Sequence, residues 1–289
     1  MHNVVRIATI AGLLGVLTGF PNVALAIPSP VLIAQVTAED FYNQGIDKYR
    51  RSNFRGAIAD YTQAIRLNPN LVSAYYNRAL ARLRLNEYQG AIEDYTQVLR
   101  VDARKANAYF NRGIARAALG DSQGALADFN QTIQLRPDLA VAYANRGRIQ
   151  HFLGNSQEAI RDYSQAIRLN PGSSITYYNR AIVRTDLGDR RGAITDYSTA
   201  LRLDSNWVDR TSADAYFNRA GVRVSLNDRV GAMTDYRRAS ELYQQQGKDA
   251  AAREALDRAK KLQPPPPRPP QKRPSRLRRP KLKSVLGLI

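Results

Sequence analysis

Apolar and polar residues follow a repeating pattern between residues 38 and 246 that predicts a series of paired amphipathic helices. The repeat is clearest in an Asn-Arg pair, usually behind an aromatic residue, which returns at equal intervals: Asn77, Asn111, Asn145 and Asn179. Asn43 lies one interval earlier, and the last step, from Asn179 to Asn218, is longer. The frame contains six units, with residues 208–212 inserted before the last: 38–71, 72–105, 106–139, 140–173, 174–207 and 213–246.

Each unit contains two helical segments whose apolar faces combine small and large residues. In the first segment, positions 4 and 8 share a helical face; position 4 is always Tyr or Phe, and position 8 is always Gly or Ala. In the second segment, position 20 is always Ala and position 24 is always Tyr or Phe. We therefore expect small residues to meet large ones where the two segments pack. Gly-Asp pairs at 120–121 and 188–189 predict turns in which the Asp caps the following helix. Three units are closed by proline, which disfavours helix at the residue before it: Pro69, Pro137 and Pro171.

This pattern resembles the tetratricopeptide repeat, a helix-turn-helix unit of about 34 residues, which is the spacing of the Asn-Arg pairs. The resemblance implies an all-α fold, a right-handed α-solenoid of six such units over residues 38–246. Residues 247–262 have high helix propensity and a polar outer face, and are predicted to form a terminal capping helix. Position 4 departs from the family, because it is Tyr or Phe where Trp is usual.

Position 6 holds the repeated Asn and lies about 160° around the helix from positions 4 and 8, so we expect it to point away from the packed face. In tetratricopeptide arrays this face lines a concave groove, and the resemblance implies that the Asn amides bind the backbone of an extended peptide. A side-chain amide both donates and accepts hydrogen bonds, which suits that task. Alternatively, each Asn bonds a neighbouring loop carbonyl. The predicted peptide-binding residues are Asn43, Asn77, Asn111, Asn145, Asn179 and Asn218, with Tyr42, Tyr76, Phe110, Tyr178, Phe217, Arg50, Arg84 and Arg148 beside them.

A second repeated pair of polar residues lies closer to the packed face. Position 7 is Arg in units two to six, position 23 is Asp in every unit, and the first unit has Gln44 at position 7. A half-buried Arg needs a partner, and the exception in the first unit suggests that each Arg pairs with the Asp of the unit before it. This scheme leaves Asp235 for Arg253 in the capping helix. Whether position 11, often Arg, shares the same Asp is left open.

Charge is concentrated at the carboxyl end of the chain. The formal net charge is +18, whereas residues 27–262 carry only +9, because the tail 263–289 has eight Lys or Arg, eight prolines and no acid. The tail is predicted to be disordered and to bind an anionic membrane surface or wall polymer. An alternative function for the chain is a nucleic-acid or polyanion binder. It is less favoured, because the tyrosines near the arginines fill the repeat frame and no specific nucleic-acid partner is expected.

The amino terminus predicts export. Arg6, an apolar run and Ala24-Leu25-Ala26 are typical of a signal peptide over residues 1–26, with cleavage before Ile27 and a linker over 27–37. Retention as an uncleaved anchor is the alternative. The protein is therefore expected in a periplasmic, lumenal or extracellular compartment.

The sequence offers few residues for catalysis. It has no Cys and two His, and it lacks a metal-ligand, nucleophile or phosphate-loop pattern. We expect no enzyme activity, no cofactor and no metal. The predicted function is a protein-protein interaction scaffold that binds an extended peptide, as an assembly or adaptor factor.

Overall fold

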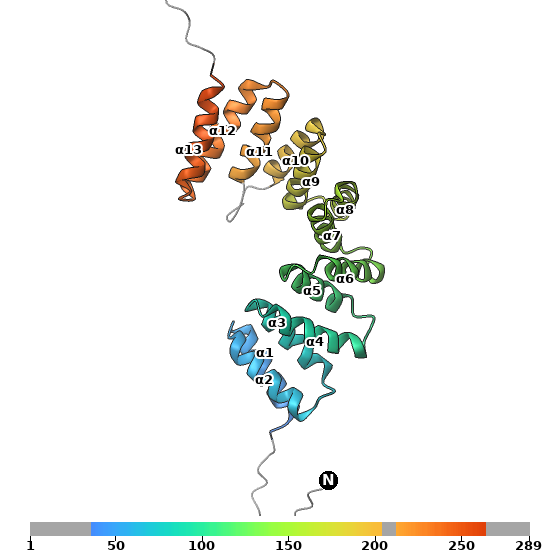
Figure 1. The fold of residues 1–289 in the computed structure, drawn as a ribbon. Helices are drawn as coiled ribbons and strands as arrows, with labels where there is room; N and C mark the ends of the chain where they lie inside the picture. The colour runs from blue at the N-terminus through green and yellow to red at the C-terminus, as the bar shows by residue number, and fades with distance from the viewer. Residues whose placement is uncertain (1–35, 204–211, 264–289) are drawn as a thin grey trace, which may run out of the picture. The chain divides into compact units, whose positions relative to one another are not determined.

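The computed structural model describes residues 36–203 and 212–263 of the chain, and every regular element in these two ranges is an α-helix (Figure 1). The helices are α1 (Ala38–Arg50), α2 (Phe54–Leu67), α3 (Val72–Arg84), α4 (Tyr88–Val101), α5 (Ala106–Ala118), α6 (Ser122–Leu135), α7 (Ala140–Phe152), α8 (Ser156–Leu169), α9 (Ser174–Asp186), α10 (Arg190–Leu203), α11 (Ser212–Ser225), α12 (Arg229–Gln245) and α13 (Asp249–Lys261).

Each helix packs on the next one along the chain, so odd-numbered and even-numbered helices form successive helix-turn-helix pairs. The odd-numbered first helices also contact one another from α1 through to α11, each touching the first helix of the next unit. They therefore form a continuous row of neighbouring helices. The expected all-α repeat fold is confirmed.

The core follows the expected meeting of small and large residues. Position 20 alanines are fully buried, and the position 24 rings are at most 3% exposed. Position 8 lies directly against these rings: a Cβ atom added to Gly45 would be 2.5 Å from Cε1 of Tyr61, and one added to Gly113 would be 2.9 Å from Cε1 of Phe129. In these two units even a Cβ atom would force the ring to shift, because real Cβ contacts are essentially never shorter than 3 Å, whereas units two, five and six carry Ala at this position. Small residues at position 8 thus admit the large rings at position 24.

The turns inside the units have one conformation. Position 15 has positive φ in every unit, which Gly adopts without strain and Asn tolerates. In four of the six units the side chain of the following residue then caps the second helix; the carboxylates of Asp121 and Asp189, for example, accept hydrogen bonds from the amides of Gly124 and Gly192 at 2.9 and 3.0 Å. The predicted caps are confirmed. The second helices α2, α6 and α8 each end two residues before the closing proline.

The last helix, α13, covers α12 through three buried alanines, Ala252, Ala255 and Ala259. The predicted signal peptide, most of the 208–212 insertion and nearly all of the basic tail lie outside the described residues. Within the described ranges, no helix is both long enough and apolar enough to cross a membrane.

Candidate functional site

The repeated Arg and Asp form ion pairs within a unit, so the predicted pairing with the preceding unit is wrong. Arg78 donates from Nε and Nη2 to the two carboxylate oxygens of Asp94, at 3.0 and 2.7 Å. Arg82, at position 11, donates to the same carboxylate at 2.8 Å. The position 7 pairing recurs in Arg112 with Asp128, Arg146 with Asp162, Arg180 with Asp196, and Arg219 with Asp235.

What reaches the preceding unit is the remaining guanidinium nitrogen of the same Arg. Nη1 of Arg78 donates to the hydroxyl of Thr62 at 3.0 Å, and position 25 supplies the acceptor in each later unit. The first unit follows no other unit, so position 7 there has no preceding position 25 to bond. Gln44 is therefore explained by the absence of this hydrogen bond between units, and not by the absence of an ion pair. The predicted partner Arg253 is exposed, and Asp235 is bonded by Arg219 and Arg223.

These arginines are held inside the repeat on their other side as well. In each of units two to six the position 7 guanidinium lies over the position 4 tyrosine, as for Arg78 at 5.6 Å from the ring centre of Tyr75. At this distance cation–π attraction contributes about 0.5–1 kcal/mol at an exposed site and more when desolvated. The guanidinium groups are therefore structural elements of each unit.

The predicted aromatic residues of position 5 are half-buried and pack on the position 24 ring of the same unit. Tyr76 meets Tyr95 with ring centres 5.6 Å apart in an edge-on arrangement. Equivalent pairs are Tyr42 with Tyr61, Phe110 with Phe129, Tyr178 with Tyr197, and Phe217 with Tyr236. Such pairs contribute about 0.5–1.5 kcal/mol beyond area burial, so position 5 supports the core as well as facing outward.

Three of the position 6 amides join neighbouring units. Nδ2 of Asn77 donates to the hydroxyl of Tyr42 at 3.1 Å, and Asn111 and Asn218 make the same bond to Tyr76 and Tyr178 at 3.4 and 3.3 Å. The acceptor is the position 5 tyrosine of the preceding unit. The hydrogen-bond partner of these three amides is thus neither a loop carbonyl nor solvent. The amides have a structural role between units, which the position of the Asn on its own helix does not reveal.

The other amides differ because the preceding unit has no hydroxyl at position 5. Phe110 precedes Asn145, whose Nδ2 donates within its own helix to the carbonyl of Val141 at 2.8 Å. Ala144 precedes Asn179, which is half-buried, and Asn43 in the first unit is exposed. The amide row is therefore interrupted in its middle.

Burial raises the pKa of two tyrosines that accept from this row, Tyr76 and Tyr178, and of the neighbouring core residue Tyr197. Burial raises the pKa of Tyr76, although the bond from Asn111 opposes the shift. Burial also raises the pKa of Tyr178, with Asp214 adding to the effect, and raises that of Tyr197 to about 12. A neutral phenol can accept the amide hydrogen and still donate its own proton.

The three predicted arginines are exposed; Arg50 and Arg84 lie near the same small pocket, whereas Arg148 lies at another. Arg50 lines a small pocket of about 120 Å³ together with Asn77. Arg84 donates at 3.4 Å to the hydroxyl of Tyr49, which lines the same pocket. Arg148 lines a separate pocket of about 170 Å³ beside Phe152, whose side chain is 77% exposed. The structure therefore does not gather all three into one cationic cluster.

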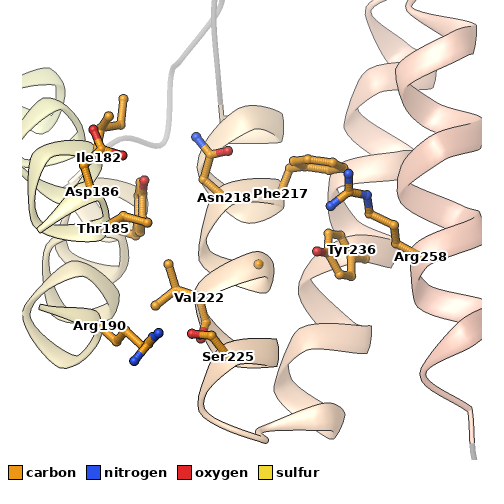
Figure 2. A pocket seen from close by; sticks show the side chains of 12 residues that line it. Ile182, Thr185, Asp186, Arg190, Phe217, Asn218, Val222, Ser225, Tyr236 and Arg258 are labelled. Carbon is orange, nitrogen blue, oxygen red and sulfur yellow. The ribbon is translucent and has the colours of Figure 1, made fainter. Parts of the chain in front are cut away.

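A larger pocket of about 460 Å³ lies at the carboxyl-terminal end of the described array (Figure 2). Its walls include Ile182 from α9, Asn218 from α11 and Tyr236 from α12, and Arg258 from α13 also borders it. Sequence reasoning missed Tyr236 and Arg258, although Gly221, where other units carry a large side chain at position 9, was a visible signal. Among the described residues, no group of His, Cys, Asp and Glu is placed to hold a metal ion.

A family model described as tetratricopeptide repeat matches residues 42–96 and 76–140, and a second model of that description matches residues 140–173. This chain is a tetratricopeptide repeat protein. The helix pairs, the small residues of position 8 and the buried rings of position 24 are its repeats. The comparison with curated proteins found no match.

Solved structures share the repeat fold. MamA is 25% identical, with a TM-score of 0.54 over 55% of this chain and 93% of MamA. The pilF protein of Pseudomonas aeruginosa is 17% identical, with a TM-score of 0.62 over 75% of this chain and 95% of pilF. YrrB, described as a tetratricopeptide repeat protein with an unusual peptide-binding site, is 18% identical, with a TM-score of 0.54 over 60% of this chain and 90% of YrrB. Repeat proteins of this kind present extended surfaces to other proteins, which makes a protein interaction scaffold the general function of the fold.

Proposed function

We propose that this tetratricopeptide repeat protein binds an extended segment of another protein along its row of first helices, without catalysing a reaction. The observation that carries the proposal is the break in the amide row. Asn145 and Asn179 follow units without a position 5 hydroxyl, so they are not committed to joining neighbouring units as Asn77, Asn111 and Asn218 are.

The surroundings of these two amides favour a peptide ligand. Ala144 stands where position 5 carries an aromatic side chain in the other units, so a smaller side chain precedes Asn145 in the row. Arg148, on the same helix as Asn145, is exposed and can meet an acidic side chain of the ligand. Each amide contributes about 0.5–1.5 kcal/mol net when it binds a peptide group, so several contacts along the row are needed.

The alternative, a nucleic-acid or polyanion binder, is less well supported by the described residues. The arginines of positions 7 and 11 are bonded to buried carboxylates, as Arg112 and Arg116 are to Asp128. They are not free to neutralise phosphates, although phosphate neutralisation dominates the affinity of most nucleic-acid binders. The basic tail, outside the described residues, keeps its predicted binding to anionic surfaces as an untested expectation.

Site-specific crosslinking in the source organism tests the proposal. A photoreactive residue replaces Asn179 in one variant and Gln131, an exposed residue of the second helix α6, in a control variant. We expect a protein partner to be crosslinked from position 179 and not from position 131, with the crosslinked peptide mapping to one continuous segment. Equal labelling from both positions, or crosslinks only to nucleic acid, would contradict the proposal.

A further inference from the structure

The pocket in Figure 2 exists because the last unit breaks the pattern of the array. Position 9 carries Ile46, Leu80, Ile114, Arg148 or Ile182 in the other units, but Gly221 in the sixth. A Cβ atom added to Gly221 would meet only the hydroxyl oxygen of Tyr236, at the ordinary contact distance of 3.8 Å. Gly221 is therefore not required by close packing, in contrast to Gly45 and Gly113. It leaves open a space that a side chain fills elsewhere.

The lining of the pocket indicates what kind of group fits. Buried or half-buried Ile182, Val222 and Tyr236 supply apolar surface, and the pocket volume of about 460 Å³ lies within the range of known small-molecule sites. Thr185, Asn218 and Ser225 add hydroxyl and amide groups to the same walls. An apolar body with a polar tip matches this combination.

Cationic groups at the edge favour an aromatic ring over an aliphatic chain. The guanidinium carbon of Arg258 lies 4.8 Å from the ring centre of Phe217, and exposed Arg190 also lines the pocket. Guanidinium groups are attracted to aromatic faces, and the ring edges of Phe217 and Tyr236 can form edge-on pairs with an added ring. Asp186, the one acid among the described residues of the lining, lies 3.5 Å from Nε2 of His151 in the preceding unit.

We infer that this pocket takes a tryptophan or tyrosine side chain of the partner protein's bound segment. The N–H or O–H at its polar tip donates to the side-chain oxygen of Asn218, Thr185 or Ser225, whose own donor groups already bond within the chain. The inference rests on the proposed function and extends it, because it names an anchor residue of the ligand. Asn218 is the last amide of the row, so an anchor in this pocket would hold one end of a segment lying along the first helices.

Nuclear magnetic resonance of the full chain tests the inference with N-acetyl-tryptophanamide as the probe and N-acetyl-leucinamide as the comparison. We expect saturable shifts of the Ile182 and Val222 methyl signals, and binding of the tryptophan amide at least about fivefold tighter than that of the leucine amide. Gly221→Leu should fill the space and weaken binding by about tenfold or more. The matched control Gly221→Ala, which also raises helix propensity but adds one methyl group, should stay within about twofold.

Other results would overturn the inference. Unchanged binding in Gly221→Leu would place the amide elsewhere, and equal binding of both amides would remove the aromatic preference. If shifts appear only after residues 264–289 are deleted, the chain's own tail occupies the pocket. If they appear only on dilution of the protein, a second copy does. If crosslinking from position 179 is retained, these outcomes overturn only the inference about the pocket. Loss of that crosslinking would contradict the proposed function itself.

Discussion

The ion pair between Arg146 and Asp162 offers the sharpest test of how the repeats are held together. Asp162 is the exception among the buried position 23 carboxylates of units two to six, because its unit has Gln150 at position 11 where the others have Arg. Arg146 is its cation, bonded at 2.6 and 2.8 Å through two nitrogens. We expect Arg146→Met to leave a carboxylate that is only 6% exposed without a counter-charge.

The expected cost follows from that burial. Removing one partner of a buried ion pair destabilises by about 3–5 kcal/mol, because the remaining charge is desolvated and unpaired. In the third unit, Arg112→Met leaves Asp128 with Arg116 at 2.8 Å, so the loss there is only that of bonds to a charged group, about 1.5–3 kcal/mol. Arg146→Met should therefore cost more than Arg112→Met. Asp162→Asn should recover part of the loss, with a coupling of about 1–3 kcal/mol.

Urea unfolding followed by far-ultraviolet circular dichroism measures these differences, provided that the slope of the transition stays constant between variants. The control cycle combines Arg146→Met with Asp128→Asn, which removes the carboxylate of the preceding unit. We expect additivity there and coupling with Asp162→Asn. Coupling to Asp128 with additivity at Asp162, or equal costs for Arg146→Met and Arg112→Met, would refute pairing within the unit.

Three further predictions concern the amides, the tyrosines and the amino terminus. Asn145→Ala with Asn179→Ala should change the free energy of unfolding by about 0.5 kcal/mol or less while weakening co-purification of the partner, whereas Asn77→Ala should cost about 0.5–1.5 kcal/mol in urea unfolding because it loses the bond to Tyr42; the reverse order would contradict the assignment. Burial raises the pKa of buried phenols, to about 12 for Tyr197, above the pKa of about 10 that a tyrosine has in the unfolded chain. The melting temperature should therefore stay constant below about pH 10 and fall as the pH rises from about 10 to 12, with tyrosinate absorbance appearing together with unfolding. Ionisation of these phenols in the folded protein would refute this prediction. Amino-terminal sequencing of protein from the source organism should find Ile27 first, and a cytoplasmic protein beginning at Met1 would rule out export.

The repeat frame could be predicted from sequence because its causes are local. Helix period, the small residue at position 8 and the cap at Asp121 each depend on residues within a few turns, and the same pattern recurs in six units. Because the signal recurs in each unit, it identifies the residues that face inward. The pairing of Arg78 failed for a different reason. Angular position on a helix shows that a side chain borders the packed face, but a long guanidinium has neighbours on both sides, and only the structure assigns Asp94 to one side and Thr62 to the other.

The candidate site was predicted only in part for the same reason. The outward position of the Asn residues is a property of one helix, whereas the bond from Asn77 to Tyr42 joins residues in different units. Position 25 was a missed signal, because its Thr, Asn and Ser residues repeat in the units that precede another unit. The pocket could not be predicted from sequence alone. Gly221 indicated a missing side chain at position 9, but the contribution of Arg258 depends on how the capping helix packs.

The confinement of each ion pair to one unit has a consequence for how such a chain can change in length. Because Asp94, Asp128 and their equivalents find their cations inside their own repeat, a whole unit forms an electrically self-contained cassette. Duplication or loss of a cassette leaves no buried charge without its partner. At the new junction, one guanidinium nitrogen of the position 7 Arg needs only a hydroxyl or amide oxygen from the unit that now precedes it. In the first unit, which follows no other unit, position 7 is Gln44 and this acceptor is not needed. The number of units is thus free to vary in steps of one without redesign of the interior.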